Sequence, residues 1–295
     1  MSDLPTGPIP VVGGRHRRRG RRTAWFVLAA VLVVGVAAAG VALALRAGSS
    51  IGGIVLPTPD GSSLAPLLPD APKVVVPPPA PPVTVTGVGF DVSYPQCRAA
   101  PPSGAAFGIV GVNGGAPLVS NKCFAAQMAW ARGTPAHAVY VNTAYAGEGD
   151  PVAYGRRLID DAIKREHDSG AGPTSMWWLD VELTNTWRGT QQQNATVLAS
   201  MAARLQELGA RVGIYSSPQQ WVEIAGDWQP GLPVWNATGP GRRSQALAAC
   251  QESFAGSSTA IAQWVQKSNG RVLDHNIVCP AWSHRGGDLF DVSHH

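Results

Sequence analysis

Two carboxylic acids, Asp180 and Glu182, stand one residue apart at the end of the segment "SMWWLDVE", which is otherwise largely apolar. Such a segment predicts a buried strand, and burying two like charges is costly unless one group keeps its proton. A carboxyl group that stays protonated near neutral pH is what a general acid needs. Hydrolysis of a sugar linkage uses such a pair: one acid protonates the leaving oxygen while the other supports the positive charge on the ring. The structural alternative, pairing with arginines or capping of a loop, is common for so short a motif.

The alternation of side chains along a strand predicts where these acids point. With a period of two, Trp178, Asp180 and Glu182 share one face, while the other face is purely apolar and suits a cover of helices. The segment "GVGFDVS" repeats the arrangement with Asp91, and Asp274 lies near the last expected strand. We therefore predict four carboxyl groups around one rim.

The elements that hold these acids alternate between short apolar runs and longer helical stretches. This alternation is typical of βαβ units and a parallel sheet, and about eight strands predict an α/β fold, a closed TIM-type barrel whose last helices are reduced or missing. Reacting groups of such barrels lie at the C-terminal ends of the strands. Helices are expected at 120–132, 151–170 and 190–210. Strands are expected at 87–92, 107–112, 138–143, 176–182 and 212–217, with weaker candidates at 232–237, 260–265 and near Val272.

The segment before the barrel predicts a membrane anchor and a spacer. Residues 23–45 carry no charge and are long enough to span a bilayer, whereas a signal-peptide core is normally only about 7–15 residues long. The arginines before this segment predict a cytoplasmic N-terminus and an extracytoplasmic C-terminal part. Secretion after signal cleavage is the alternative. The expected organisation is a basic tail (1–22), a transmembrane helix (23–46), a Pro-rich linker (47–86) and a barrel domain (87–295).

Charge and cysteine content narrow the function classes. From position 47 onward the chain has 16 Lys and Arg against 18 Asp and Glu, so the basic character belongs to the tail and does not indicate a nucleic-acid partner. Four cysteines allow three pairings, and an oxidising compartment favours disulfides over a zinc site, for which no paired-ligand spacing is present. We expect no metal, no cofactor and no required protein partner. The cysteines are Cys97, Cys123, Cys250 and Cys279.

Four motifs in this order, "GFDVSYPQ", "WWLDVE", "RVGIYSS" and "AQW…VLDHN", resemble glycoside hydrolase family 25 lysozymes and the related domains of exported actinobacterial proteins. The resemblance covers essentially all of 87–280. It implies a TIM-type barrel of eight strands with reduced helices after the fifth strand, which cleaves between N-acetylmuramic acid and N-acetylglucosamine in peptidoglycan. It also implies that Glu182 is the general acid, that Asp180 orients the acetamido group or stabilises an oxazolinium-like intermediate, and that Asp91 and Asp274 are the opening and closing aspartates.

The substrate-binding residues combine this resemblance with aromatic side chains near strand ends, which could stack on sugar faces. The chain departs from the family at two places: Asn113 stands where a basic residue is usual, and Asn142 stands at or near a usual histidine. These changes alter the substrate cleft. The expected substrate-binding residues are Tyr215, Asn113, Asn142, Trp178, Trp235, Gln263 and Trp264.

The sequence therefore predicts a membrane-anchored, extracytoplasmic glycoside hydrolase-like protein whose partner is cell-wall polysaccharide. The alternative from another class is a catalytically silent barrel that binds cell-wall glycan without turnover. An acyl or amide hydrolase is disfavoured, because no GxSxG motif is present.

Overall fold

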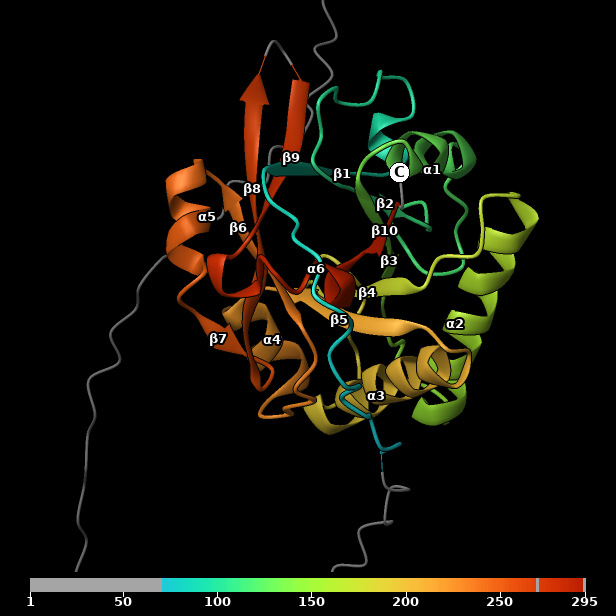
Figure 1. Cartoon of the computed structure of the whole chain (residues 1–295). Helices are drawn as coiled ribbons and strands as arrows, with labels where there is room; N and C mark the ends of the chain where they lie inside the picture. The colour runs from blue at the N-terminus through green and yellow to red at the C-terminus, as the bar shows by residue number, and fades with distance from the viewer. Residues whose placement is uncertain (1–70, 269–270, 294–295) are drawn as a thin grey trace, which may run out of the picture. The chain divides into compact units, whose positions relative to one another are not determined.

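The computed structural model of the chain describes residues 71–268 and 271–293 (Figure 1). Eight strands close into a barrel in the order β1, β2, β3, β4, β5, β6, β8, β9 and back to β1, as the sequence predicts. Two short strands, β7 and β10, pair only at the edges of β8 and β3. The strands are β1 (Val88–Val92), β2 (Gly108–Gly111), β3 (Ala136–Asn142), β4 (Met176–Asp180), β5 (Arg211–Ser216), β6 (Val234–Pro240), β7 (Ser253–Phe254), β8 (Ser257–Ser268), β9 (Arg271–Val278) and β10 (Asp291–Val292).

The last barrel strand corrects the expectation of a parallel sheet. The other seven strands are parallel to their neighbours within the barrel, but β9 is antiparallel to both β8 and β1. Only residues 269 and 270 separate β8 from β9, which is too short a connection for the crossover that a parallel pair requires. Residues near the start of β9 therefore lie at the same end of the barrel as the C-terminal ends of the other strands.

Helices surround the barrel and become shorter after the fifth strand, as predicted. Helices α2 and α3 have 18 and 17 residues, whereas α4 and α5 have 8 and 7. No helix among the described residues is both long and apolar enough to cross a bilayer; the predicted transmembrane helix, 23–46, lies outside the described residues. The helices are α1 (Phe124–Arg132), α2 (Pro151–Asp168), α3 (Gln191–Glu207), α4 (Pro218–Ala225), α5 (Arg243–Ala249) and α6 (Gly286–Leu289), with 3-10 turns η1 (Tyr94–Gln96) and η2 (Pro280–Trp282).

The starts of the two long helices follow from local sequence. Asp150 accepts hydrogen bonds from two backbone N–H groups of the first turn of α2. Pro151, the first helical residue, has no N–H group that would need an acceptor. Thr190 and Gln193 form a reciprocal capping box at the start of α3. The two helices then approach closely at Gly155, where an added Cβ would lie 2.5 Å from the carbonyl oxygen of Val197.

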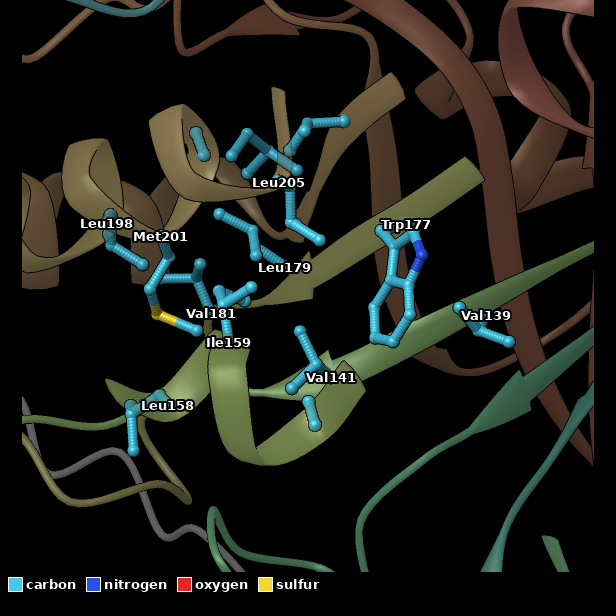
Figure 2. Packing of buried hydrophobic residues seen from close by; sticks show 14 of the residues in the cluster. Val139, Val141, Leu158, Ile159, Trp177, Leu179, Val181, Leu198, Met201 and Leu205 are labelled. Atoms are coloured by element: carbon cyan, nitrogen blue, oxygen red, sulfur yellow. The ribbon is translucent and has the colours of Figure 1, made fainter. Parts of the chain in front are cut away.

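The main core lies between the outer face of the barrel and these helices (Figure 2). Trp177, Leu179 and Val181 point outward from β4 and the residues after it, into a fully buried layer with Ile159 and Leu205. A second cluster, which includes Trp178, fills the barrel interior. The alternation predicted for this strand is confirmed, and it separates a structural face from a face that opens into the barrel.

Residues 71–86, which the sequence assigns to the linker, lie along the end of the barrel opposite the acids, where the parallel strands begin (Figure 1, cyan). Val75 exchanges two hydrogen bonds with the Gln206 side chain of α3, and the N–H of Ala80 donates to Asp288. Val83 and Val85 pack against the interior cluster. Residues 71–86 are therefore in contact with the barrel that follows them, and we call this segment the strap.

Two disulfides connect sequence-local cysteines. Cys97 pairs with Cys123, and Cys250 pairs with Cys279. The first joins the loop after β1 to the start of α1, and the second joins the end of α5 to the end of β9. The paired cysteines are 26 and 29 residues apart in the sequence. Each disulfide therefore closes a loop in the unfolded chain, and it restricts the unfolded chain more than the folded one.

Candidate active site

Strand β4 brings the first two predicted acids to the interior end of the barrel. Asp180 is the last residue of β4 and is 4% exposed, and Glu182 follows two residues later in the loop. Trp178 lies below them on the same face, where its ring meets Trp235 edge-on at 5.8 Å. Gly213 on the neighbouring strand makes room for that ring, since an added Cβ there would lie 2.3 Å from it.

Strands β1 and β9 bring the other two acids together. Asp91 and Asp274 are direct partners across this antiparallel pair, so their side chains lie on the same face. Asp91 is buried, and its Oδ2 accepts hydrogen bonds from Asn276 (2.7 Å) and Gln263 (2.9 Å). Two neutral amides, and no cation of the described residues, therefore hold this carboxyl group.

The four acids share one pocket of about 280 Å³ at the C-terminal end of the parallel strands. Its walls come from β1, β3, β4, β5, β6, β8 and β9, so nearly the whole ring contributes. The lining residues are Asp91, Tyr140, Asp180, Glu182, Tyr215, Trp235, Gln263, Val265 and Asp274.

A chain of hydrogen bonds runs from Asp91 to the rim of this pocket. Gln263 donates to Asp91 and accepts from the Tyr215 hydroxyl at 2.9 Å. The same hydroxyl lies 3.5 Å from Oε1 of Glu182. Because one hydroxyl carries one proton, Tyr215 is committed to Gln263, and Glu182 is only weakly restrained. Trp235 closes the other end by donating to Oδ1 of Asn276 at 2.8 Å.

Asp180 is held on one side only. Its Oδ2 accepts a hydrogen bond from Nδ2 of Asn142 at 2.5 Å, whereas its buried Oδ1 has no hydrogen-bond partner among the described residues. Asn142 is in turn fixed by its own N–H, which donates to Oδ1 of Asn113 at 3.0 Å. A buried acceptor without a donor is costly, so Oδ1 is available to an N–H group of a ligand.

Burial raises the proton affinity of all four acids. Burial, then the charge of Asp274, raises the pKa of Asp91 well above its usual range, and burial, then the charge of Glu182, does the same to the pKa of Asp180. Burial raises the pKa of Glu182, and burial with the charge of Glu182 raises the pKa of Asp274 to about 6. No ion pair within 71–268 and 271–293 includes any of them.

This electrostatic pattern suits proton transfer at a bond between neutral sugars. Every acid in the pocket has a raised pKa, and the contacts of the Glu182 carboxyl group are long, 3.5 Å to the Tyr215 hydroxyl and 3.4 Å to the Thr184 hydroxyl. A general acid must be within hydrogen-bond reach of its substrate and keep a proton to donate. Within the described part of the chain no group of three or more His, Cys, Asp or Glu side chains is spaced to hold a metal ion.

Not every predicted substrate-binding residue reaches the pocket. Tyr215, Trp235 and Gln263 line it. Asn113 and Asn142 form a layer behind Asp180, and Trp178 lies beneath the floor. The prediction for Trp264 is wrong in position: its ring lies on the outer face of β8, 3% exposed and stacked on His275 at 5.0 Å, because it is one residue out of phase with Gln263.

Three residues of the site were missed from the sequence. Tyr140 lies two residues before Asn142 and on the same face of β3. Gly111 on β2 leaves space for the Tyr140 ring. Val265 lies two residues after Gln263 on the same face, and Asn276 two residues after Asp274. The period-two rule, applied outward from residues already chosen, would have found all three.

A larger cavity, about 850 Å³, lies at the opposite end of the barrel beside the strap. Its main charged groups are matched: Arg211 donates to Asp291 at 2.6 Å and also to the backbone carbonyl of Phe290. Size therefore does not identify the reactive site here. The smaller pocket is the candidate, because it alone gathers the four unmatched carboxyl groups.

Residues 113–264 match the family model described as Lysozyme-like protein 1. Among curated proteins, the probable GH family 25 lysozyme 4 of Dictyostelium discoideum is 37% identical over 71 residues, 23% of this chain and 33% of that protein. Lysozyme 2 of the same type and organism is 38% identical over 64 residues, 21% of this chain and 30% of that protein. The matched stretch thus spans about a third of the length of these relatives.

Among solved structures, the chain is similar to GHIP, a glycosyl hydrolase 25 of Streptococcus pneumoniae described as a virulence factor in host cell invasion. The identity is 20%, the TM-score is 0.49, and the alignment covers 70% of this chain and 94% of that one.

Proposed function

The chain belongs to the family of lysozyme-like proteins, with a domain of the glycoside hydrolase family 25 type, and from this premise we propose that it hydrolyses the glycan strands of peptidoglycan as a muramidase. One observation carries the proposal: four acids from three strands converge on a single open pocket in which their pKa values are raised and no described cation neutralises them.

In the proposed reaction Glu182 is the general acid. Its raised pKa keeps the proton that it gives to the glycosidic oxygen as the bond to the anomeric carbon breaks. The loose contacts of its carboxyl group, 3.5 Å to Tyr215 and 3.4 Å to Thr184, leave it free to take a proton back from the attacking water.

Asp180 acts on the sugar's acetamido group. Once Asp180 is ionised, its Oδ1, which has no donor among the described residues, accepts the acetamido N–H, and accepting that bond favours attack of the acetamido carbonyl oxygen on the anomeric carbon. Asn142 fixes Asp180 through the other oxygen, so the carboxyl plane stays oriented during the reaction. Asp91 and Asp274 support positive charge at the pocket floor when they ionise.

The experiment uses the full-length chain on insoluble peptidoglycan, with release of new reducing ends followed over time and the released fragments analysed by mass. A muramidase leaves N-acetylmuramic acid at the reducing end; a glucosaminidase leaves N-acetylglucosamine. Glu182→Gln should release none. Glu207→Gln, the same change at an exposed glutamate of α3, is the matched control and should retain the rate.

A second candidate is a silent barrel that binds cell-wall glycan. It is favoured by the neutral amides of Asn113 and Asn142, which stand behind Asp180 where the related enzymes carry basic and imidazole side chains. Under this candidate, native protein and Glu182→Gln sediment equally with peptidoglycan and neither releases reducing ends.

We also propose that the barrel lies outside the cytoplasmic membrane, anchored through residues 23–46, with the basic tail 1–22 inside. The two disulfides support an oxidising compartment. Protease treatment of intact cells, followed by detection of the tail and the barrel separately, tests this orientation. Loss of the tail epitope from intact cells would contradict it.

A further inference from the structure

The two strands at one side of the pocket continue beyond the barrel as a two-stranded arm, residues 266–268 and 271–273 (Figure 1). Strand β8 pairs with β6 only as far as Val265, and β9 pairs with β1 only from Asp274 onward. Past these points the two strands pair only with each other, with Lys267 opposite Val272. Arg271 anchors the arm to the loop after β1 by donating to the carbonyl oxygen of Ala100.

One face of this arm continues the wall of the pocket. Gln263 and Val265 line the pocket, and alternation places Lys267 on their face of β8. Its partner Val272 stands on the face of β9 that carries Asp274 two residues later, and it is 54% exposed. At a rise of about 3.3 Å per residue, the Cα of Lys267 lies roughly 7 Å beyond that of Val265. The four-carbon stem of a lysine lets its ammonium group range over the pocket entrance.

Lys267 has no acidic partner there. It is exposed and forms no ion pair with any described residue, and Asp274, the nearest acid on that face, owes its raised pKa to burial and Glu182 with no opposing cation. A second cation stands close by: Gly241 donates its N–H to the carbonyl of Val265 at 3.0 Å, and exposed Arg242 follows directly. Two exposed basic residues therefore stand on segments next to a pocket whose floor is acidic.

We propose that Lys267, with Arg242 beside it, forms a subsite for a carboxylate group on an acidic glycan, and so selects such chains over neutral ones. The inference rests on the proposed function and names the substrate class of the same pocket. The acids on the floor repel an anionic substituent, so the substituent must lie toward the entrance while the neutral sugar ring enters. An ammonium group on the arm meets it there, and the exposed Val272 contacts the apolar part of the sugar.

The carboxylate could come from the sugar's own lactyl group or from a peptide attached to it. Binding of the full-length chain to three soluble tetrasaccharides separates these sources. They are a neutral N-acetylglucosamine tetramer, a muramic-acid-containing tetramer with free lactyl carboxylates, and the same tetramer carrying peptides. Calorimetry gives each dissociation constant at low and at high salt, with Glu182→Gln in the background wherever the native chain hydrolyses the glycan.

Lys267→Gln should weaken binding of the acidic tetramers by roughly three- to tenfold at low salt, and much less at high salt, because an exposed charge pair is screened. Binding of the neutral tetramer should be unchanged. Lys267→Arg should restore most of the affinity. The matched control is Lys164→Gln, which removes the same charge from the exposed surface of α2. A loss with only one of the two acidic tetramers identifies the source of the carboxylate.

Two results would overturn the subsite. An equal loss on all three glycans would assign Lys267 to support of the pocket itself, and no loss on the acidic glycans would remove it from binding. If the native chain binds none of the tetramers, the proposed function fails together with the subsite. If it binds all three equally, only the subsite fails.

Discussion

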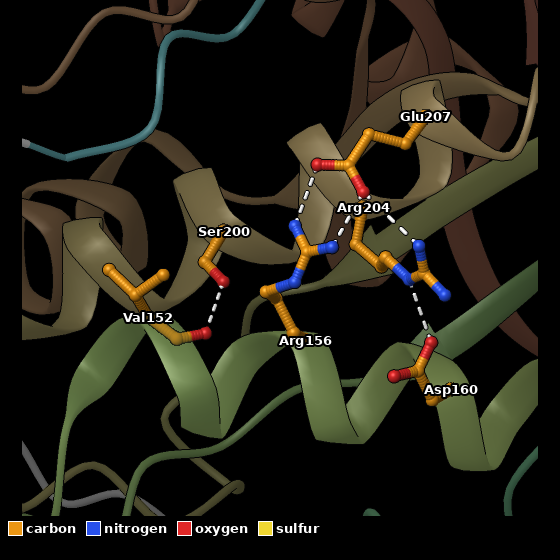
Figure 3. Close-up of polar contacts among 6 residues, drawn as sticks. All are labelled: Val152, Arg156, Asp160, Ser200, Arg204 and Glu207. Atoms are coloured by element: carbon orange, nitrogen blue, oxygen red, sulfur yellow. Dashed lines mark hydrogen bonds and ion pairs between the residues drawn. The ribbon is translucent and has the colours of Figure 1, made fainter.

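Charged groups are arranged in opposite ways on the outside of the barrel and in its pocket. Between α2 and α3, Arg156 donates two hydrogen bonds of 2.6 Å to Glu207, and Arg204 bridges Glu207 and Asp160 at 3.1 and 2.7 Å (Figure 3). Each acid on this surface has a cation. In the pocket four acids have none among the described residues, whose hydrogen bonds to these carboxyl groups come only from neutral amides and hydroxyls.

The two regions also respond to pH in opposite directions. Hydrogen bonds from Arg156 and Arg204 lower the pKa of Glu207 to about 2, so its stabilisation is present above its unfolded pKa and is lost as pH falls toward 2. Burial raises the pKa of Asp274 to about 6, so this group makes the folded state less stable as pH rises from about 4 through 6. A fold gains nothing from the second arrangement, which is why we assign it to function.

Glu182→Gln tests whether the unpaired acids of the pocket serve catalysis, and it has the largest expected effect. Replacing the acid by an amide of the same shape removes the transferable proton, and general acid catalysis typically contributes about 10²–10⁴-fold. We expect release of reducing ends from peptidoglycan to fall by at least roughly 100-fold. The melting temperature should not fall, because a raised pKa marks a group that costs stability when ionised. Full activity of this variant would show that Glu182 is not the general acid.

Asn142→Ala tests whether the asparagine that holds Asp180 contributes to catalysis. It leaves Oδ2 of buried Asp180 without its donor, beside an Oδ1 that already lacks one. A lost hydrogen bond to a charged group costs about 1.5–3 kcal/mol, so the rate should fall by roughly ten- to a hundredfold. The pKa of Asp180 should rise further, since the Asn142 hydrogen bond lowers it, and the acidic limb of the pH–rate profile, which follows ionisation of Asp180, should then move to higher pH. A uniform rate loss with an unchanged profile would indicate a merely structural role.

Much of the fold could be predicted because its signals are local. The outward face of β4 is apolar through Trp177, Leu179 and Val181, and this period-two pattern gave the strand, its orientation and the side of the acids. The antiparallel β9 could not be predicted in this way. A strand's own sequence carries no mark of direction, and only the length of the preceding connection decides it.

The four acids of the site could be predicted from the sequence, but the roles of the residues around them could not. Asp91, Asp180, Glu182 and Asp274 all reach one pocket, because strand ends converge in a closed barrel. Trp264 was assigned from its aromatic type, its place near a strand end and the "AQW" motif, and it lies on the outer face. Whether an asparagine contacts substrate or orients a carboxyl group, as Asn142 does, depends on distances of a few ångströms between separate strands, which one sequence does not encode locally.

Asp274→Asn tests whether an unpaired acid of the pocket makes the folded state less stable. The shift of its pKa from 3.8 to about 6 corresponds to an upper limit of about 3 kcal/mol that the ionised group costs the folded state, and the amide removes this cost. We expect the variant to be more stable than the native chain at pH 8, and the difference to disappear near pH 4. Urea unfolding at the two pH values measures it. A destabilised variant at pH 8 would mean that Asp274 has a favourable partner in solution.

Glu207→Gln completes the comparison with the smallest expected effect. Exposed ion pairs contribute little, because water and salt screen them and the side chains lose freedom. The variant should melt slightly below the native chain at pH 7, and the difference should shrink in high salt and vanish as pH falls from about 4.5 toward 2, where native Glu207 also takes up its proton. The sign of this pH dependence is opposite to that of Asp274→Asn, so thermal unfolding of both variants across one pH series tests the comparison directly. If the two differences changed in the same direction with pH, charge matching would not distinguish the outside of the barrel from its pocket, and the raised pKa values of the pocket acids would no longer support its assignment to catalysis.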